Sequence, residues 1–246
     1  MGEGLDGFWG LVTDVDGTIT DDRRHIDTRA IDAMRRLTDE GICVILASGN
    51  TSCFMDAISK MIGTGGVYIG ENGGIIRQGW NHDLEILGDG TPSRIALWDL
   101  VRACRARGIA IEHYSLPYRF VDVAFARTVP ASLAREILHD HPVMVLDTGY
   151  AIHIHPPGVS KGIAFSRLCQ LLGREPGDFI AVGDGENDVD LLERAGVGVA
   201  VANAHPGLKR AADVVTEKEF GEGFLEALNR YFPISGRDNG QQRCNP

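Results

Sequence analysis

The 246-residue sequence predicts an α/β protein with a doubly wound parallel sheet and a smaller α+β domain inserted into it. Short apolar segments alternate with segments of helical periodicity in the first third of the chain and again in the last third. Apolar strands separated by helices indicate a parallel sheet covered on both faces, as in a Rossmann-like fold. Between residues 83 and 155, short strands alternate apolar and polar residues, which is typical of a sheet with one exposed face.

The first third of the chain is expected to hold three strands and two helices. The apolar segment "FWGLVT" predicts the first strand. Ile31, Met34 and Leu37 then recur at helical spacing, and the glycine at position 41 marks the end of that helix. In order, we expect a strand at 8–13, a helix at 28–41, a strand at 42–49, a helix at 53–63 and a strand at 66–70.

The middle of the chain is expected to form an antiparallel sheet with helices on one side. In "RFVDVAFA", Val121, Val123 and Phe125 alternate with small or charged residues, which suits a half-buried strand. The segment "DTG" before Tyr150 is a turn signal between two short strands. We expect helices at 93–108 and 131–141, and strands at 119–126, 143–149 and 150–156.

Strand and helix alternate again after residue 156, so the first domain is expected to be interrupted by the second. This predicts a discontinuous core at residues 1–82 and 156–232 and an inserted domain at 83–155. A flexible tail is expected at 233–246, where the sequence is polar and contains glycine and proline. The last third is expected to hold helices at 162–173, 187–196, 206–212 and 223–232, and strands at 178–184, 198–204 and 213–216.

Composition and charge argue against several classes of partner. Hydrophobic residues make up 43% of the chain and charged residues 24%, which is typical of a globular protein. The formal net charge of −10 argues against nucleic acid and against an anionic membrane, since both need a broad basic surface. No segment approaches the ~18 consecutive apolar residues of a membrane span. The five scattered cysteines indicate reduced thiols, so a cytoplasmic location is expected.

Polar and charged residues follow the expected core strands at the point where each strand ends. Ligands of an open parallel sheet bind outside the carboxyl ends of its strands, so these residues should converge. Several carboxylates in one small site repel each other unless a cation is present, and oxygen ligands suit Mg²⁺. The sequence therefore predicts a magnesium site beside a phosphate-binding site. The converging segments are Asp14 and Asp16, Ser48 to Asn50, Asn72 to Gly74, Lys161, and Gly183 to Asp188.

Taken singly, these segments also have structural interpretations. Two aspartates after a strand can form a solvated turn, and serine, glycine and asparagine are common turn residues. Asn72 is equally consistent with facing a substrate or with completing a turn. His153 and His155 share one face of a strand, but no third metal ligand is evident, so we interpret them as structural or as lining the mouth of a cleft.

Taken together, "DVDGT", "LASGN", Lys161 and "GDGEND" resemble the four motifs of the haloacid dehalogenase superfamily, in the order found in its magnesium-dependent phosphatases. The insertion between the second and third motifs resembles the C2-type cap of the Cof-like branch. Within that branch, "ASGN" followed by "GENGGII" is similar to the archaeal phosphoglycolate phosphatases. The resemblance spans residues 8–232.

The resemblance implies catalysis through an aspartyl-phosphate. Asp14 would be the nucleophile, and Asp16 would protonate the leaving alkoxide and then activate water. Mg²⁺ would be the cofactor, and Thr18 would support the site by hydrogen bonding. The implied metal ligands are Asp14, Asp16 through its backbone carbonyl, and Asp184, with Asp188 either a further ligand or a partner that acts through water. The implied substrate contacts are Ser48, Gly49, Asn50, Asn72, Lys161 and Asn187.

The expected function is hydrolysis of a small phosphorylated metabolite, and the resemblance favours 2-phosphoglycolate. Arg119 is a candidate for contacting the carboxylate of such a substrate. A phosphosugar phosphatase or a phosphomutase on the same scaffold is the main alternative, and a phosphate- or metal-binding protein without turnover is a third. The sequence leaves the oligomeric state open, with a homodimer as one candidate.

Overall fold

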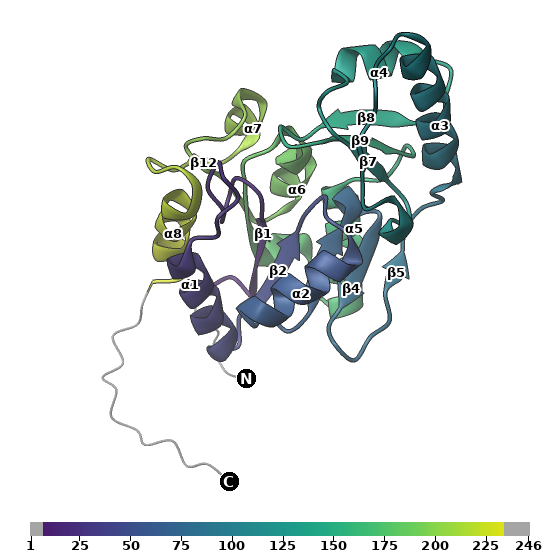
Figure 1. The fold of residues 1–246 in the computed structure, drawn as a ribbon. Helices are drawn as coiled ribbons and strands as arrows, with labels where there is room; N and C mark the ends of the chain where they lie inside the picture. Colours follow the sequence, from purple (N-terminus) through teal and green to yellow (C-terminus); the bar gives the residue numbers. More distant parts are fainter. Residues whose placement is uncertain (1–6, 234–246) are drawn as a thin grey trace.

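The computed structural model describes residues 7–233, which form two sheets flanked by helices (Figure 1). The larger sheet has eight strands in the order β12-β11-β10-β1-β2-β3-β4-β5, and it is mostly parallel. The expected tail at 233–246 lies outside the described residues except for its first position. The strands of the larger sheet are β1 (Gly10–Asp14), β2 (Cys43–Ala47), β3 (Val67–Gly70), β4 (Ile75–Gln78), β5 (Glu85–Ile86), β10 (Phe179–Gly183), β11 (Val197–Ala200) and β12 (Val214–Val215).

The centre of this sheet follows the apolar segments of the sequence. β1 pairs in parallel with β2 on one side and with β10 on the other. All five residues of β1 are buried, and Leu11, Val12 and Ile45 are fully enclosed in the core. β4 and β5 are antiparallel additions that the sequence patterns did not indicate, and β5 extends the core sheet beyond residue 82.

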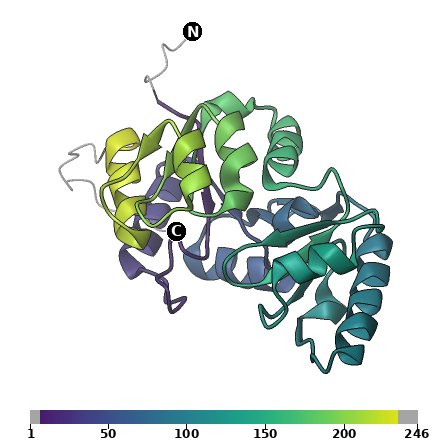
Figure 2. The same cartoon turned by 90° about the horizontal axis from the view of Figure 1, so that it is seen from above.

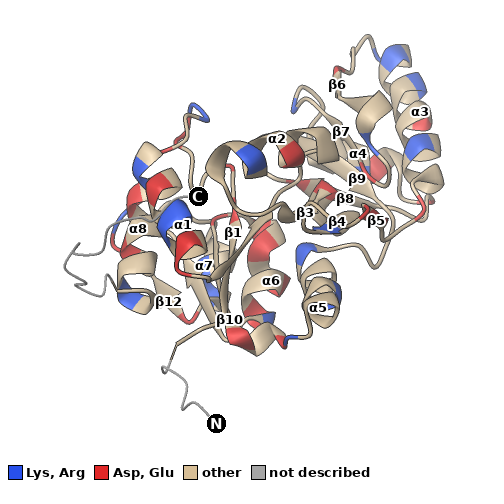
Figure 3. Ribbon diagram, turned by 90° about the horizontal axis from the view of Figure 1, so that it is seen from below, with Lys and Arg blue, Asp and Glu red and all other residues tan. Residues whose placement is uncertain are grey.

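Helices cover both faces of the larger sheet, which confirms the α/β class with a doubly wound core. In sequence order, α1 and α2 connect strands toward one edge, whereas α6 and α7 connect strands toward the other. Right-handed crossovers then put the two pairs on opposite faces. Figure 3 shows α1, α2 and α8 on one side of the strands and α5 and α6 on the other. These helices are α1 (Thr28–Asp39), α2 (Ser52–Ile62), α5 (Lys161–Leu172), α6 (Val189–Arg194), α7 (Pro206–Ala211) and α8 (Phe220–Tyr231).

The middle of the chain forms a separate four-stranded antiparallel sheet in the order β6-β7-β9-β8, with its own apolar core. Figures 1 and 2 show it with its two helices at one side of the molecule. Val123 and Phe125 belong to this apolar core, whereas Ala124, between them on the chain, pairs with His153 and lines the pocket described below. The elements are β6 (His113–Tyr114), β7 (Val123–Phe125), β8 (Met144–Asp147), β9 (Ile152–His155), α3 (Thr91–Ala106) and α4 (Ala131–Ile137).

Several expected elements are shorter in the structure. The strand expected at 119–126 is limited to β7, and the helix expected at 131–141 ends at Ile137. The helix expected at 187–196 is divided into a 3₁₀ turn, η4 (Glu186–Asp188), and α6. The four cysteines among residues 7–233 are free thiols. Within the same range, no helix is both long and apolar enough to cross a membrane.

Candidate active site

The carboxyl ends of three neighbouring parallel strands bring the motif residues to one edge of the larger sheet. Asp14 is the last residue of β1, Ser48 follows β2, and Asp184 follows β10. β1 lies between the other two strands, so these three side chains come from adjacent positions along the edge. They line one pocket together with Asp16 and Asn187.

A buried lysine links two of the aspartates. Lys161 is the first residue of α5, and the Ser160 hydroxyl caps that helix by accepting the N–H of Ile163 at 3.2 Å. The Lys161 Nζ atom lies 2.5 Å from Asp14 Oδ1 and 2.6 Å from Asp188 Oδ1. Burial alone would lower the pKa of Lys161, but the two carboxylates raise it above its ordinary value. The lysine is therefore a fixed positive charge beneath the pocket.

Asp14, Asp184 and Asp188 form an acidic cluster suited to a metal ion. Each offers a carboxylate oxygen within 4.8 Å of the others. Burial, more than the neighbouring carboxylates, raises the pKa of Asp14 and brings the pKa of Asp184 to about 7. Asp14 Oδ2 is buried without a hydrogen-bond partner among residues 7–233. Crowded, desolvated carboxylates with a free oxygen fit a hard divalent cation, which would neutralise them.

Asp188 is the most constrained member of this cluster. Its Oδ1 atom accepts from Lys161, and its Oδ2 atom accepts the backbone N–H groups of Asp184 at 3.2 Å and Gly185 at 2.9 Å. Its side chain is fully buried. Asp184 also accepts the Thr18 hydroxyl at 3.3 Å, as the expected supporting role of Thr18 requires.

The Asp16 side chain lies apart from the acidic cluster. Asn50 Nδ2 donates to Asp16 Oδ2 at 2.9 Å and to Ser48 Oγ at 2.9 Å. Arg24 Nε lies 3.7 Å from Asp16 Oδ1. The Asp16 side chain is 21% exposed and lines the pocket, so it can exchange a proton with a bound molecule. Its carboxylate is not one of the three that form the acidic cluster.

Two glycines allow these groups to approach closely. Gly17 has a φ of +87°, and a Cβ atom there would lie 2.3 Å from Asp184 Oδ2. At Gly49, a Cβ atom would lie 2.9 Å from Asn72 Nδ2 and 3.1 Å from His153 Cε1. Any larger residue at either position would push the site apart.

Asn72 lies behind Gly49 rather than on the surface of the pocket. It belongs to η1 (Glu71–Gly73) after β3 and is 2% exposed. Asn187 Nδ2 donates to Asn72 Oδ1 at 3.1 Å, so the structure joins two of the predicted site residues. Direct contact of Asn72 with a substrate stays a prediction.

The second sheet supplies one wall of the pocket, including residues that the sequence patterns did not single out. Tyr150, from the β8–β9 turn, has its pKa raised to about 12 by burial and then by Asp184, Asp16 and Asp14. The Arg24 guanidinium lies 4.7 Å from the centre of the Tyr150 ring. Neither Tyr150 nor Arg24 belongs to a sequence motif that could have identified it, although Tyr150 follows a turn signal.

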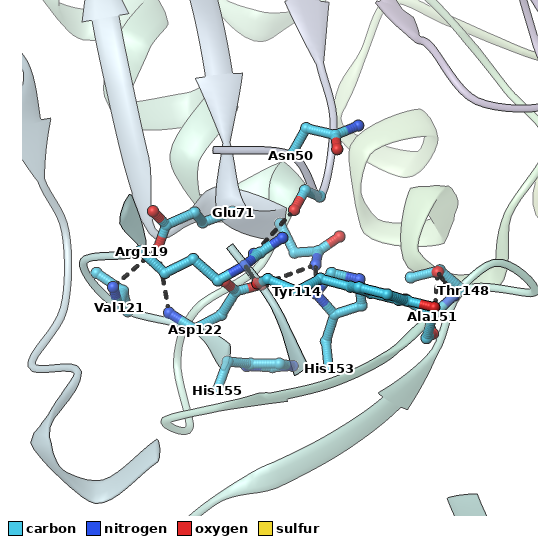
Figure 4. A network of polar contacts seen from close by, with 12 residues as sticks. Asn50, Glu71, Tyr114, Arg119, Val121, Asp122, Thr148, Ala151, His153 and His155 are labelled. Atoms are coloured by element: carbon cyan, nitrogen blue, oxygen red, sulfur yellow. Dashed lines mark hydrogen bonds and ion pairs between the residues drawn. The ribbon is translucent and has the colours of Figure 1, made fainter. Parts of the chain in front are cut away.

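His153 lines the pocket, whereas His155 Nδ1 donates to the backbone carbonyl of Pro156 at 3.0 Å. His153 Nδ1 lies 2.7 Å from Asp122 Oδ2, and Figure 4 shows these residues in one polar network with Arg119 and Glu71. This agrees with the interpretation of the two histidines as structural or cleft-lining residues. Glu71 and Asp122, both fully buried, were missed because nothing in their sequence context distinguishes them from exposed acids.

Comparisons with known proteins agree with this geometry. The profile of the haloacid dehalogenase-like hydrolases matches residues 11–116 and 116–228. The chain belongs to this family. A protein from Methanoculleus marisnigri that is named phosphoglycolate phosphatase is 53% identical over 225 residues, which cover 91% of this chain and 96% of that protein.

Solved structures of low sequence identity share the fold of this chain. The crystal structure of Thermoplasma acidophilum 0175 matches with a TM-score of 0.82 at 22% identity, covering 93% of this chain and all of the other. The subclass IIB sugar phosphatase BT4131 matches with a TM-score of 0.75 at 17% identity, covering 92% of this chain and 99% of the other. These structures confirm the predicted fold, and the family profile confirms the predicted superfamily.

Proposed function

We propose that this chain is a Mg²⁺-dependent phosphomonoester hydrolase that converts 2-phosphoglycolate and water to glycolate and phosphate. The observation that carries the proposed chemistry is the convergence of Asp14, Lys161 and Asp184 from three distant segments at one edge of the sheet. Membership in a hydrolase family supports the reaction class. The substrate is taken from the relative that is 53% identical over 91% of this chain.

Asp14 is the proposed nucleophile. Its Oδ1 atom is held by Lys161, and its Oδ2 atom has no hydrogen-bond partner within residues 7–233. Attack of this carboxylate on phosphorus would form an acyl phosphate as the bond from phosphorus to the glycolate oxygen breaks. The ammonium group of Lys161 stays beside the reacting carboxylate and would stabilise negative charge on the phosphoryl oxygens.

Asp16 is the proposed proton carrier. Its carboxyl would donate a proton to the departing glycolate oxygen, and the resulting carboxylate would then take a proton from water. Attack of that water on phosphorus would release phosphate and restore Asp14. The hydrogen bond from Asn50 holds the Asp16 side chain at the pocket, apart from the acidic cluster, where it can reach the leaving oxygen of a bound ester.

The remaining motif residues are proposed to bind the phosphoryl group and the metal. Ser48 and Asn50 offer a hydroxyl and an amide at the pocket, with Gly49 between them, and Asn187 lines the same pocket. Asp14, Asp184 and Asp188 would hold Mg²⁺, together with the backbone carbonyl of Asp16. When bound, the ion neutralises the clustered carboxylates and polarises the phosphoryl group.

The second sheet is proposed to act as a cap over this site. The proposed division keeps residues 1–82 and 156–232 as core and residues 83–155 as cap. Tyr150 and His153 from the cap face the same pocket as Asp14 and Asp16 from the core, so closure would exclude bulk water from the reacting groups. A cytoplasmic location belongs to the same proposal, and a homodimer remains one candidate assembly.

A phosphate-release screen tests the proposed function. Purified protein with Mg²⁺ is given 2-phosphoglycolate, hexose phosphates and triose phosphates, and inorganic phosphate is measured over time. We expect the highest kcat/KM for 2-phosphoglycolate. A preference for hexose phosphates would favour the phosphosugar phosphatase alternative. Substrate rearrangement without release of phosphate would indicate a phosphomutase, and no turnover of any ester would contradict the proposal.

A further inference from the structure

Two arginines line the pocket, and their surroundings differ. Arg24 comes from the core, and its side chain is 52% exposed and faces Asp16. Arg119 follows the 3₁₀ turn η2 (Leu116–Tyr118) of the second sheet and is only 5% exposed. The partners of a guanidinium buried at the wall of a ligand pocket are informative, because burying a charge is costly unless the charge is paired and hydrogen-bonded.

Three contacts fix the orientation of the Arg119 guanidinium. Its Nε donates to Tyr114 O at 3.1 Å, and its Nη1 donates to Gly49 O at 3.1 Å and also to Asp122 Oδ1. Its Nη2 atom has no acceptor among residues 7–233, and Figure 4 shows this network around the side chain. The protein therefore holds the Nε and Nη1 atoms of the guanidinium, while Nη2 is left to donate to a bound ligand.

Asp122 is itself held by other residues, so the Arg119–Asp122 pair cannot rotate freely. Its Oδ2 atom lies 2.7 Å from His153 Nδ1 and 3.3 Å from Asn72 Nδ2. Although burial would raise the pKa of Asp122, Arg119 and His153 together lower it below its ordinary value. An ionised Asp122 places the His153 proton on Nδ1, because a carboxylate oxygen can only accept, and its other oxygen pairs with Arg119 Nη1.

Glu71 fastens this part of the second sheet to the core. Its carboxylate accepts the backbone N–H groups of Phe120 at 3.0 Å, Val121 at 2.8 Å and Asp122 at 3.2 Å. The backbone immediately after Arg119 is therefore tied to the segment that follows β3. Together with the contact to Gly49, this sets the distance between Arg119 and the loop that holds Ser48 and Asn50.

We propose that Arg119 is the specificity-determining residue that binds the carboxylate of the substrate through Nη2. This inference rests on the proposed function. In 2-phosphoglycolate, three single bonds separate phosphorus from the carboxyl carbon, so the cation must lie next to the phosphoryl site. Arg119 meets this requirement because it contacts Gly49, the residue between Ser48 and Asn50. A fixed guanidinium suits a carboxylate better than a flexible ammonium does.

The test compares substrates that differ only in the carboxylate. Wild type, Arg119→Gln and Arg119→Lys are assayed with Mg²⁺ on 2-phosphoglycolate and on 2-hydroxyethyl phosphate, and the ratio of the two kcat/KM values is taken. Arg24→Gln, which changes the other pocket arginine, is the matched control. Because Arg119→Gln leaves Asp122 with one partner fewer, the double variant Arg119→Gln/Asp122→Asn is measured as well, since it leaves no unpaired buried charge.

We expect the ratio to fall about 10- to 100-fold in both glutamine variants, the loss of one charge-assisted hydrogen bond, and to recover partly in Arg119→Lys. Arg24→Gln should keep the wild-type ratio. A wild-type preference that survives in the Arg119 variants, or that is lost only in Arg24→Gln, would overturn the inference and leave the proposed substrate standing. A wild type that does not prefer 2-phosphoglycolate would refute both.

Discussion

Lys161→Met removes the cation that lies between two buried aspartates, Asp14 and Asp188, and its cost can be worked out from the structure. The Nζ atom lies 2.5 Å from Asp14 and 2.6 Å from Asp188, and the side chain is fully buried. At an effective dielectric constant of about 20, each contact is worth roughly 6 kcal/mol of Coulomb attraction, most of which offsets the desolvation of the three charges. Removing the lysine keeps the desolvated carboxylates without their partner. We therefore expect the free energy of unfolding to fall by about 3–5 kcal/mol without metal.

The pH and metal dependence of this loss identifies its cause. Burial already raises the pKa of Asp14, so this carboxylate can escape the penalty by taking up a proton, and the loss should be larger at pH 8 than at pH 5. Added Mg²⁺ should recover part of it, because a divalent ion can replace the missing positive charge. We also expect kcat/KM for phosphate release to fall about 10²- to 10³-fold, the usual effect of losing a charge that stabilises the transition state.

Urea denaturation at both pH values, with EDTA or with Mg²⁺, measures the effect on stability. Lys60→Met, at an exposed position of α2, is the matched control and should change the free energy of unfolding by less than about 0.5 kcal/mol. If Lys161→Met unfolds at the same urea concentration as Lys60→Met and keeps the wild-type kcat/KM, Lys161 does not hold the nucleophile Asp14, and the proposed active site is wrong.

Three further results are expected. Burial raises the pKa of Asp184 to about 7, so the native state binds more protons than the unfolded state between about pH 4 and 7, and metal-free stability is lost as pH rises through that window. The free energy of unfolding of Asp184→Asn in EDTA, relative to that of wild type, should therefore rise by roughly 1–4 kcal/mol between pH 5 and pH 8. Thermal melting of both proteins at each pH measures this difference, and a difference that does not change with pH would argue against the raised pKa. Glu71→Gln should lower the free energy of unfolding, measured in urea, by about 1–3 kcal/mol because it weakens the acceptor for three backbone N–H groups. Glu85→Gln, the control in a partly exposed pair with Arg167, should lower it by about 1 kcal/mol or less. Equal losses in the two variants would show that Glu71 does not stabilise the fold through these N–H groups. Removal of divalent ions with EDTA should abolish phosphate release and added Mg²⁺ should restore it, so activity that persists in EDTA would contradict the metal site.

Much of the core could be predicted because its signals are local. β1, β2 and β10 are apolar runs, and the motif residues come directly after them in the sequence. Once a parallel sheet is inferred, the convergence of Asp14, Ser48 and Asp184 follows from strand direction alone. The identity of Lys161 as the partner of Asp14 came from the motif order, since 147 residues separate the two in the chain.

The contacts between the two sheets could not be predicted because they depend on tertiary partners. Residues 120–122 looked like part of a strand, but the carboxylate of Glu71 takes their N–H groups, so regular pairing begins only at Val123. Nothing in the sequence pairs Glu71 with a segment 50 positions away. β6 is two residues long, too short to produce a periodic pattern. Arg119 could be named as a candidate from the chemistry of the expected substrate, whereas its partners could not.

Phosphate release from 2-phosphoglycolate by wild type and by Asp14→Asn, both with Mg²⁺, tests directly whether the reaction passes through Asp14. Asp32→Asn, on the exposed face of α1 with a side chain 77% exposed, is the matched control. We expect Asp14→Asn to stay folded by circular dichroism and to release phosphate at less than about 1% of the wild-type rate. Asp32→Asn should match wild type. A folded Asp14→Asn that releases phosphate at a rate near that of wild type would show that the reaction does not pass through Asp14.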